Sequence, residues 1–400
     1  MRLPVHPRVL IEPPLSLPDD DTGVLLLSMR KVSDLVGYCA LYELEDLMAD
    51  MLGSGIGYVT NDLSVSLARK MYKAVRLLSG SRRLADTTGT VIPSITLPRQ
   101  YELFFPVFNH IFEVFALNAL ADWRKRCDQA VCYLGEAWTS ELPLYLVEQL
   151  RAFDHIFVGV AGATEELSRL SGRPCSYLPR AVDALKFCPY PGEPERSIDV
   201  CGIGRRSSIT HQALLAYAQR GTRFYYYDTL QVRSGSVNSI SYGVTDAAEH
   251  RLLLSNLLKR SRYFIANRAF ADRPALTQGQ EEISGRYYEG AAAGAVMLGL
   301  PPNSDGFRRQ FDWEGAIIPT EFHAPDIAKT IAQLDSDPAR LARIRKGSVV
   351  NSLLRHDWVY RLRTILEVLG RPPTPRMLER EQQLAALAAS VQAADGGATG

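Results

Sequence analysis

Short apolar runs alternate with segments of helical periodicity twice along this chain, on either side of a proline-rich interruption. The first series has strand-like runs at 23–29 (GVLLLSM), 101–107, 129–134, 155–159 and 175–178. Continuous apolar runs are typical of strands buried on both faces of a parallel sheet. The segments between them, at 111–126, 141–152 and 164–170, have helical spacing, so the pattern predicts βαβ units.

The alternation starts again after residues 183–197 (DALKFCPYPGEPERS), where prolines and charges interrupt it. Strand-like runs at 198–202, 223–227, 263–267 and 295–300 alternate there with helical segments, of which the last is 358–369. A chain of 400 residues suits two domains of this size. We therefore expect an irregular arm (1–21), an α/β domain (22–182), a linker (183–197), a second α/β domain (198–370) and a helical tail (371–400). The last helix of the second domain is a candidate to pack back on the first.

The overall composition is that of an ordinary globular protein. Lys and Arg total 45 against 44 for Asp and Glu, which favours neither nucleic acid nor a strongly anionic surface as a partner. The six cysteines are scattered without a CxxC pair, as expected of reduced core thiols. No apolar run approaches the roughly 20 residues that span a bilayer, and the first residues lack a signal-peptide core. We expect a cytoplasmic protein.

The stretch 281–302 (EEISGRYYEGAAAGAVMLGLPP) carries the most chemistry. It predicts a loop, a short helix with Ser284 as N-cap, a turn at Gly294 and a buried strand. The free N–H groups and the dipole at such a helix start favour an anion such as a diphosphate. Glu281 and Glu289 flank it, and carboxylates there suit sugar and ribose hydroxyls. Small residues on a helix are equally typical of close packing against a sheet, and that alternative stays open.

In combination, four segments resemble the GT-B glycosyltransferases, in particular the group-1 (family 4-like) branch with the bacterial spore-maturation-type enzymes. The segments, all in the family's order, are 153–189 (FDHIFVGVAGATEELSRLSGRPCSYLPRAVDALKFCP), 198–206 (IDVCGIGRR, preceded by Ser197), 285–299 (GRYYEGAAAGAVMLG) and 355–366 (RHDWVYRLRTIL). The resemblance covers residues 150–370 well and the first half in outline. It implies an α/β GT-B fold, in which two Rossmann-like domains face each other across a cleft.

The resemblance also implies a glycosyltransferase (a hexosyltransferase) that uses a nucleotide-sugar, retains the anomeric configuration and needs neither metal nor other cofactor. Glu289 would bind the donor ribose, and Glu281 would lie near the transferred sugar. Arg205 and Arg206, which follow a glycine loop, would neutralise the diphosphate leaving group, because it departs as an anion. Catalytic candidates are thus Glu281, Arg205 and Arg206; donor-binding candidates are Gly202, Gly204, Arg286, Tyr287, Glu289 and Gly294.

Three residues near strand ends of the first domain are candidates for acceptor contact: His110, Glu136 and Trp138. Each has an ordinary alternative, since a lone histidine is often structural and the loop after a strand often only packs. The acceptor class stays open among saccharide, lipid-linked, protein and small-molecule acceptors. A peripheral membrane contact also stays open, whereas nucleic acid is not expected.

The main alternative is a dinucleotide enzyme. Residues 202–207 (GIGRRS) follow a strand and open a helix as a GxGxxG loop does, and Asp228 ends the next strand, where a ribose-binding acid belongs. Ser207 replaces the third glycine, and this alternative leaves 281–302 without a role. An epimerase of the same fold and a GT-B-like binding protein without catalysis also remain alternatives.

Overall fold

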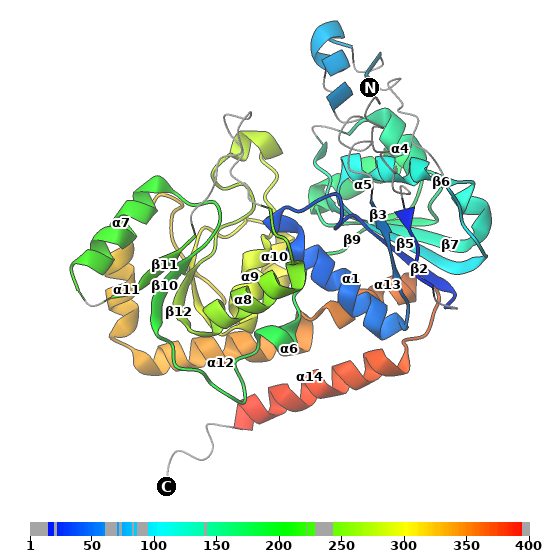
Figure 1. Ribbon diagram of the computed structural model, residues 1–400. Helices are drawn as coiled ribbons and strands as arrows, with labels where there is room; N and C mark the ends of the chain where they lie inside the picture. Colours follow the sequence, from blue (N-terminus) through cyan, green and yellow to red (C-terminus); the bar gives the residue numbers. More distant parts are fainter. Residues whose placement is uncertain are drawn as a thin grey trace, which may run out of the picture.

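The computed structural model describes residues 15–19, 22–60, 70–71, 74–81, 84–85, 95–139, 142–221, 223–228 and 243–393. Over these residues it contains two large sheets, one in each half of the chain (Figure 1). Of the expected N-terminal arm only 15–19 is described, and residues 394–400 and most of the Ser/Gly-rich segment 233–243 lie outside the described residues.

The first sheet has the strand order β1-β3-β2-β5-β7-β8-β9, and its pairs are parallel except β1 with β3. Its strands are β1 (Leu15–Ser16), β2 (Val24–Ser28), β3 (Ile56–Val59), β5 (Tyr101–His110), β7 (Cys127–Glu136), β8 (His155–Val158) and β9 (Cys175–Tyr177). Helix α1 (Cys39–Leu52) packs on one face, while α4 (Leu144–Leu150) and α5 (Thr164–Ser171) pack with the other. The strands expected from apolar runs in this half are therefore confirmed.

The helix expected over 111–126 is wrong. The chain forms a 3-10 stretch, η2 (Ile111–Ala119), then β6 (Leu120–Ala121), which pairs with β4 (Ile95–Thr96), and a second 3-10 turn, η3 (Trp123–Arg126). The Glu113 carboxylate accepts the N–H of Asn109, and His110 Nδ1 accepts that of Phe112. Such local side-chain bonds compete with an α-helix, and the aromatic and β-branched residues here favour it little.

The second sheet has the order β11-β10-β12-β13-β14, all parallel. Its strands are β10 (Ile198–Gly202), β11 (Tyr225–Tyr227), β12 (Ser261–Ile265), β13 (Val296–Gly299) and β14 (Ile318–Pro319). Its helices are α7 (Ser208–Gln219), α8 (Ala247–Lys259), α9 (Gly285–Ala292), α10 (Asp305–Gln310) and α11 (Ile327–Asp335), with the short η6 (Pro274–Thr277) before α9. The short helix and strand expected within 281–302 are α9 and β13, and Gly294, with φ +62°, ends the helix.

The short α6 (Ala184–Phe187) lies between the two sheets in sequence, after η5 (Ala161–Ala163) and β9. The chain ends in three helices, α12 (Pro338–Arg355), α13 (Trp358–Val368) and α14 (Pro375–Ala393). Helix α14 runs beneath both halves, along α12 and past α1 (Figure 1). One apolar cluster continues from Leu26 of the first sheet to Phe264 of the second.

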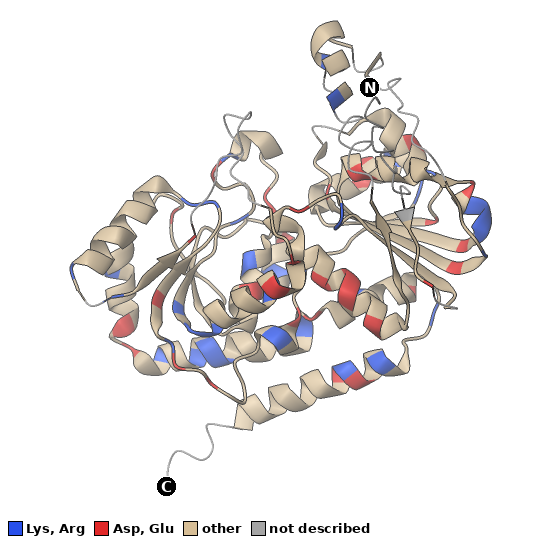
Figure 2. Ribbon diagram, in the orientation of Figure 1, with Lys and Arg blue, Asp and Glu red and all other residues tan. Residues whose placement is uncertain are grey.

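Where the two halves meet, the charged positions of α1 are acidic, whereas α8 carries charges of both signs (Figure 2). All six cysteines are unpaired, and five are buried, as expected of core thiols. None of the described helices is long and apolar enough to cross a bilayer.

Candidate functional site

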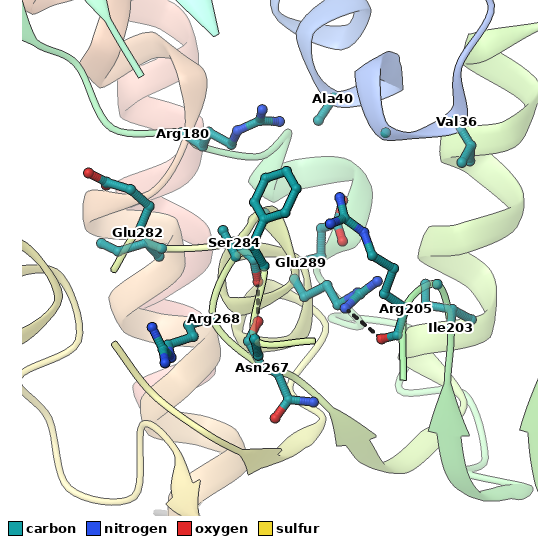
Figure 3. Close-up of a pocket in the computed structure, with 18 of the residues that line it drawn as sticks. Val36, Ala40, Arg180, Ile203, Arg205, Asn267, Arg268, Glu282, Ser284 and Glu289 are labelled. Carbon is teal, nitrogen blue, oxygen red and sulfur yellow. Dashed lines mark hydrogen bonds between the residues drawn. The ribbon is translucent and has the colours of Figure 1, made fainter. Parts of the chain in front are cut away.

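A cavity of about 410 Å³ lies between the two sheets, at the carboxyl ends of their strands. From the first sheet it is lined by residues that end or follow β7 and β8, such as Glu136 and Gly159. From the second it is lined by residues that follow β10 and β12, such as Ile203 and Asn267 (Figure 3). This edge is where open parallel sheets bind ligands, because loops of both sheets converge there.

The first turn of α9 forms one wall of the cavity, through Ser284, Gly285 and Arg286. Ser284 stands at the expected N-cap, but its hydroxyl donates to the backbone carbonyl of Asn267 at 2.8 Å and does not cap the helix. The first N–H groups of α9 therefore have no side-chain cap. With the helix dipole they make this wall attractive to an anion.

Two arginines stand beside this wall. Arg205 lies 4.2 Å over the ring of Phe270 and 3.7 Å from Asp272. Arg286 is enclosed against the loop of Arg205, whose carbonyl its Nη1 meets at 3.5 Å. Burial, and after it the charge of Arg205, lowers the pKa of Arg286 below its ordinary value. An incoming anion would relieve this repulsion.

Arg206, which the resemblance assigns with Arg205 to the diphosphate, bonds to other residues of the chain. Its guanidinium donates to the carbonyl of Gly202 at 3.1 Å and pairs with Asp228. It lines a small neighbouring pocket of about 10 Å³ and is not among the residues that line the main cavity. In this arrangement Arg206 fixes the loop after β10.

The three neighbouring glutamates of the loop and helix have different surroundings. Glu289 lines the cavity and pairs with Arg251 of α8. Glu281 does not line it: its carboxylate pairs with Arg268 at 2.8 Å and accepts the N–H of Asn303 at 2.6 Å. The acid that enters the cavity is the adjacent Glu282 (Figure 3).

Glu282 joins the two halves of the cavity. It is 6% exposed and accepts the N–H of Gly162, in η5 after β8, at 3.3 Å. Burial raises its pKa to about 7, although the N–H groups of Gly162 and Ala161 act in the opposite direction. A carboxyl group with this pKa can either donate or accept a proton near neutral pH.

The remaining donor-side candidates divide between the cavity and the core. Gly204 lines the cavity and Gly202 the small neighbouring pocket. Tyr287 is fully buried, donates to the carbonyl of Leu300 at 2.7 Å and packs on Phe307, outside the cavity lining. Gly294 lies at the other end of α9, against Val349.

The acceptor-side candidates also divide. Glu136 lines the cavity 3.5 Å from Arg180, and Trp138 lines it with its ring edge-on to Phe270, 5.4 Å between centroids. His110 is not among the lining residues and instead accepts the N–H of Phe112 at the start of η2. Its position is that of a structural histidine.

Sequence reasoning missed several lining residues: Arg180, Arg251, Asn267, Arg268, Phe270, Asp272 and Glu282. Asn267 and Arg268 follow directly after β12, so the rule that ligands bind at strand carboxyl ends was the available signal. Phe270 has a positive φ of 53°, a conformation uncommon for a bulky residue. No short motif marks Arg251, which lies within a regular helix.

Comparison with known proteins gives two findings. Residues 250–367, which run from within α8 through α9 and α12 to near the end of α13, match a family described as glycosyl transferase-like. Among curated proteins no relative matches the sequence.

Solved structures resemble most of the chain. The UDP-forming α,α-trehalose-phosphate synthase from Burkholderia xenovorans has 10% identity over 87% of this chain and 99% of its own, with a TM-score of 0.52. The corresponding enzyme from Burkholderia vietnamiensis has 10% identity over 88% and 99%, with a TM-score of 0.51. The N-terminal domain of trehalose-6-phosphate phosphatase from Candida albicans has 10% identity over 87% and 99%, with a TM-score of 0.53. At this identity the likeness concerns the fold, and it confirms the expected GT-B arrangement of two Rossmann-like domains.

Proposed function

We propose that this chain, a glycosyltransferase of the GT-B fold by its family match and architecture, transfers a sugar from a nucleotide-sugar to an acceptor hydroxyl in the cavity between its sheets. The observation that carries the proposal is the wall formed by the uncapped start of α9 with Arg205 and Arg286. A diphosphate there would receive backbone N–H groups and two guanidinium groups. These are the donors that a departing nucleoside diphosphate requires.

The donor nucleoside and sugar would occupy either side of that diphosphate. Glu289 lines the cavity from the second turn of α9, and we assign it to the ribose hydroxyls. Glu282 and Arg180 lie toward the first sheet, and we assign them to the transferred sugar and the acceptor. Retention, which the resemblance to the GT-B enzymes implies, is part of this proposal. Independence of metal is a further part, because Arg205 and Arg286 supply the positive charge.

The dinucleotide alternative gains no support from Asp228. Both of its carboxylate oxygens accept the N–H of Gly204, at 3.0 and 2.9 Å, and it also pairs with Arg206. An acid that binds the 2′-hydroxyl of a dinucleotide ribose must direct its oxygens to the ligand. Here they hold the glycine loop.

The test is a thermal-shift screen against UDP-, GDP-, ADP- and TDP-sugars, with and without EDTA, followed by donor hydrolysis with the best ligand. A specific donor raises the unfolding temperature by mass action. Glu289→Ala should abolish the shift and the hydrolysis, whereas Glu249→Ala, an exposed position on α8, should preserve both. If no nucleotide-sugar shifts the wild type, or NAD does so instead, the proposal is wrong. NMR of the product anomer decides between retention and inversion, and loss of activity in EDTA would contradict metal independence.

A further inference from the structure

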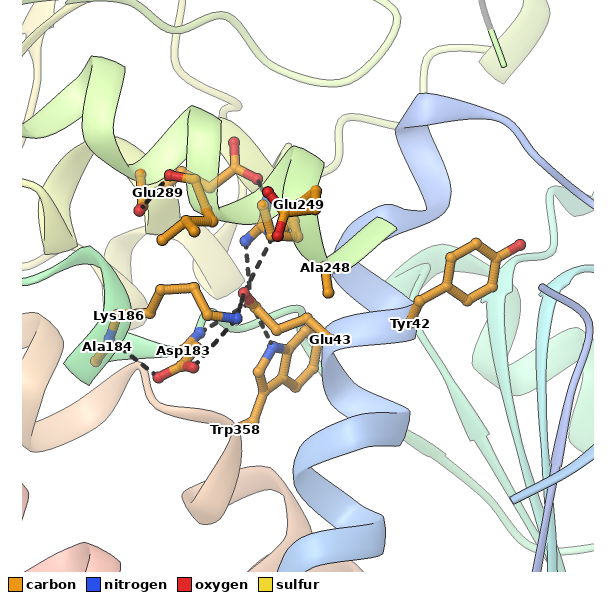
Figure 4. Close-up of polar contacts among 12 residues, drawn as sticks. Tyr42, Glu43, Asp183, Ala184, Lys186, Ala248, Glu249, Glu289 and Trp358 are labelled. Carbon is orange, nitrogen blue, oxygen red and sulfur yellow. Dashed lines mark hydrogen bonds and ion pairs between the residues drawn. The ribbon is translucent and has the colours of Figure 1, made fainter. Parts of the chain in front are cut away.

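The carboxylate of Glu43 is buried where the two halves meet and accepts several hydrogen bonds there. It lies on α1, beneath the first sheet, with its side chain 1% exposed. It accepts the backbone N–H of Asp183 at 3.0 Å, Nζ of Lys186 at 3.2 Å and Nε1 of Trp358 at 3.3 Å (Figure 4). A buried carboxylate is tolerated only when its lone pairs are matched in this way, so the position of Glu43 is fixed.

Arg251 joins this carboxylate to the cavity. It lies on α8 with its side chain 3% exposed, and its Nε and Nη2 meet the two oxygens of Glu43 at 3.2 and 3.0 Å. Its Nη1 donates to Oε1 of Glu289. Burial alone lowers the pKa of Arg251, but the two carboxylates outweigh it and raise that pKa above the ordinary value. The guanidinium therefore stays charged and bridges an acid of each half.

Glu289 is consequently held by one oxygen. Oε1 accepts a hydrogen bond from Arg251, whereas Oε2 accepts none from any residue in the described ranges. The side chain of Glu289 lines the cavity. Glu43 is not a lining residue. An anchored carboxylate with one oxygen directed at a ligand loses little entropy on binding, which is how a neighbouring group raises affinity without contact.

We propose that Arg251 and Glu43 are positioning residues of the donor site: they hold Glu289 so that its second oxygen receives the ribose hydroxyls. The proposal rests on the proposed function. Its consequence is that a residue of the first half, outside the cavity, governs the affinity of the nucleotide bound by the second. Arg251 reaches the two carboxylates through three separate nitrogens, Nε and Nη2 on Glu43 and Nη1 on Glu289. The single nitrogen of a shorter lysine cannot occupy all three positions, so Arg251→Lys would keep the charge and lose this fixed geometry.

The test uses Arg251→Lys and compares two ligands by calorimetry. The first ligand is the tightest binder among UDP, GDP and ADP, and the second is its 2′,3′-dideoxy form. Two ribose hydroxyls that donate to a carboxylate should raise the affinity about 10- to 100-fold. The wild type should therefore bind the ribose form more tightly than the dideoxy form by that factor. In Arg251→Lys the preference should fall to about threefold or less, while the dideoxy affinity stays unchanged. Glu43→Gln should behave in the same way and serves as the second variant if the first does not fold.

The matched control is Arg380→Lys. Arg380 also bridges two buried acids at this junction, Asp183 at 2.6 Å and Asp357 at 2.7 Å, but it does not contact Glu289. It should lose stability and keep the wild-type preference for ribose. If Arg251→Lys and Glu43→Gln also keep that preference, the inference is overturned while the proposed function stands. If the wild type binds none of the three diphosphates and no TDP-sugar either, the proposed function itself fails.

Discussion

Gly204 and Arg286 share one small volume at the cavity wall. A Cβ built on Gly204 would lie 1.9 Å from Nη2 of Arg286, and Gly204 has a φ of +70°. The absent side chain thus serves two purposes: it permits a left-handed turn after β10, and it leaves room for the guanidinium that we assign to the diphosphate.

Gly204→Ala should therefore lower both stability and nucleoside-diphosphate affinity. The positive φ alone costs about 1–2 kcal/mol for a residue with a Cβ, and displacement of Arg286 should raise the Kd by about tenfold or more. Gly172→Ala is the matched control, because Gly172 has a φ of +67° and a Cβ added to it would meet no atom within 4 Å. It should lose similar stability in urea titration and bind like the wild type. Equal affinities for the two variants would contradict the assignment of Arg286.

Replacing Arg286 itself should separate binding from stability. Its lowered pKa shows that the folded chain disfavours the charged guanidinium. Arg286→Gln should hence unfold at the same or a higher temperature than the wild type, yet lose about 10- to 100-fold in diphosphate affinity, as expected for a charge-assisted hydrogen bond.

Arg206→Gln should have the opposite result: lower stability and little change in diphosphate affinity. It removes the counter-charge of Asp228 and a donor to the carbonyl of Gly202. Among the described residues the acid then keeps only the N–H of Gly204, and the loss should cost about 1–3 kcal/mol of stability. Calorimetry and thermal melts on the two variants check both expectations. Greater loss of affinity in Arg206→Gln than in Arg286→Gln would return the phosphate role to Arg206.

The sequence sufficed for the sheets but not for the choice between neighbouring residues at the site. Runs such as 23–29 have one stable outcome, a strand buried on both faces, and β2 forms there. The 3-10 stretch η2 was not predicted because a side chain, that of Glu113, bonds the backbone just before it. The periodicity of the sequence carries no sign of such a bond.

At the cavity, adjacent residues of one type have different surroundings for reasons that lie far away in sequence. Arg268 pairs with Glu281, whereas Glu282 accepts the N–H of Gly162 in the opposite half. Asp228 likewise draws Arg206 away and leaves Arg205 at the cavity. A motif can place such a pair near a site, but only tertiary contacts decide which member reaches it.

Glu282 should make stability depend on pH. Its pKa is about 7 in the folded chain against an ordinary value of 4.5, so the folded chain binds this proton more tightly than the unfolded chain. Stability from this group is present in acid and declines as pH rises from about 4.5 to 7, by on the order of 3 kcal/mol. Glu282→Gln should remove that decline. The check is urea denaturation of both proteins from pH 4.5 to 8; parallel curves for the two would show that Glu282 does not titrate as expected.

Gly290 tests the close-packing interpretation of the small-residue helix, which is compatible with the anion-binding role that we propose for its first turn. A Cβ there would lie 2.8 Å from both Met297 Sδ and Phe264 Cδ1, on the strands beneath α9. Alanine normally stabilises a helix by about 1 kcal/mol relative to glycine, but overpacking costs about 1–3 kcal/mol. Gly290→Ala should therefore give no gain or lose up to about 2 kcal/mol. Gly347→Ala, inside α12 with its nearest atom at 3.8 Å, should gain about 0.5–1 kcal/mol. If urea titration shows equal gains for both, α9 does not pack on the sheet as closely as the structure requires.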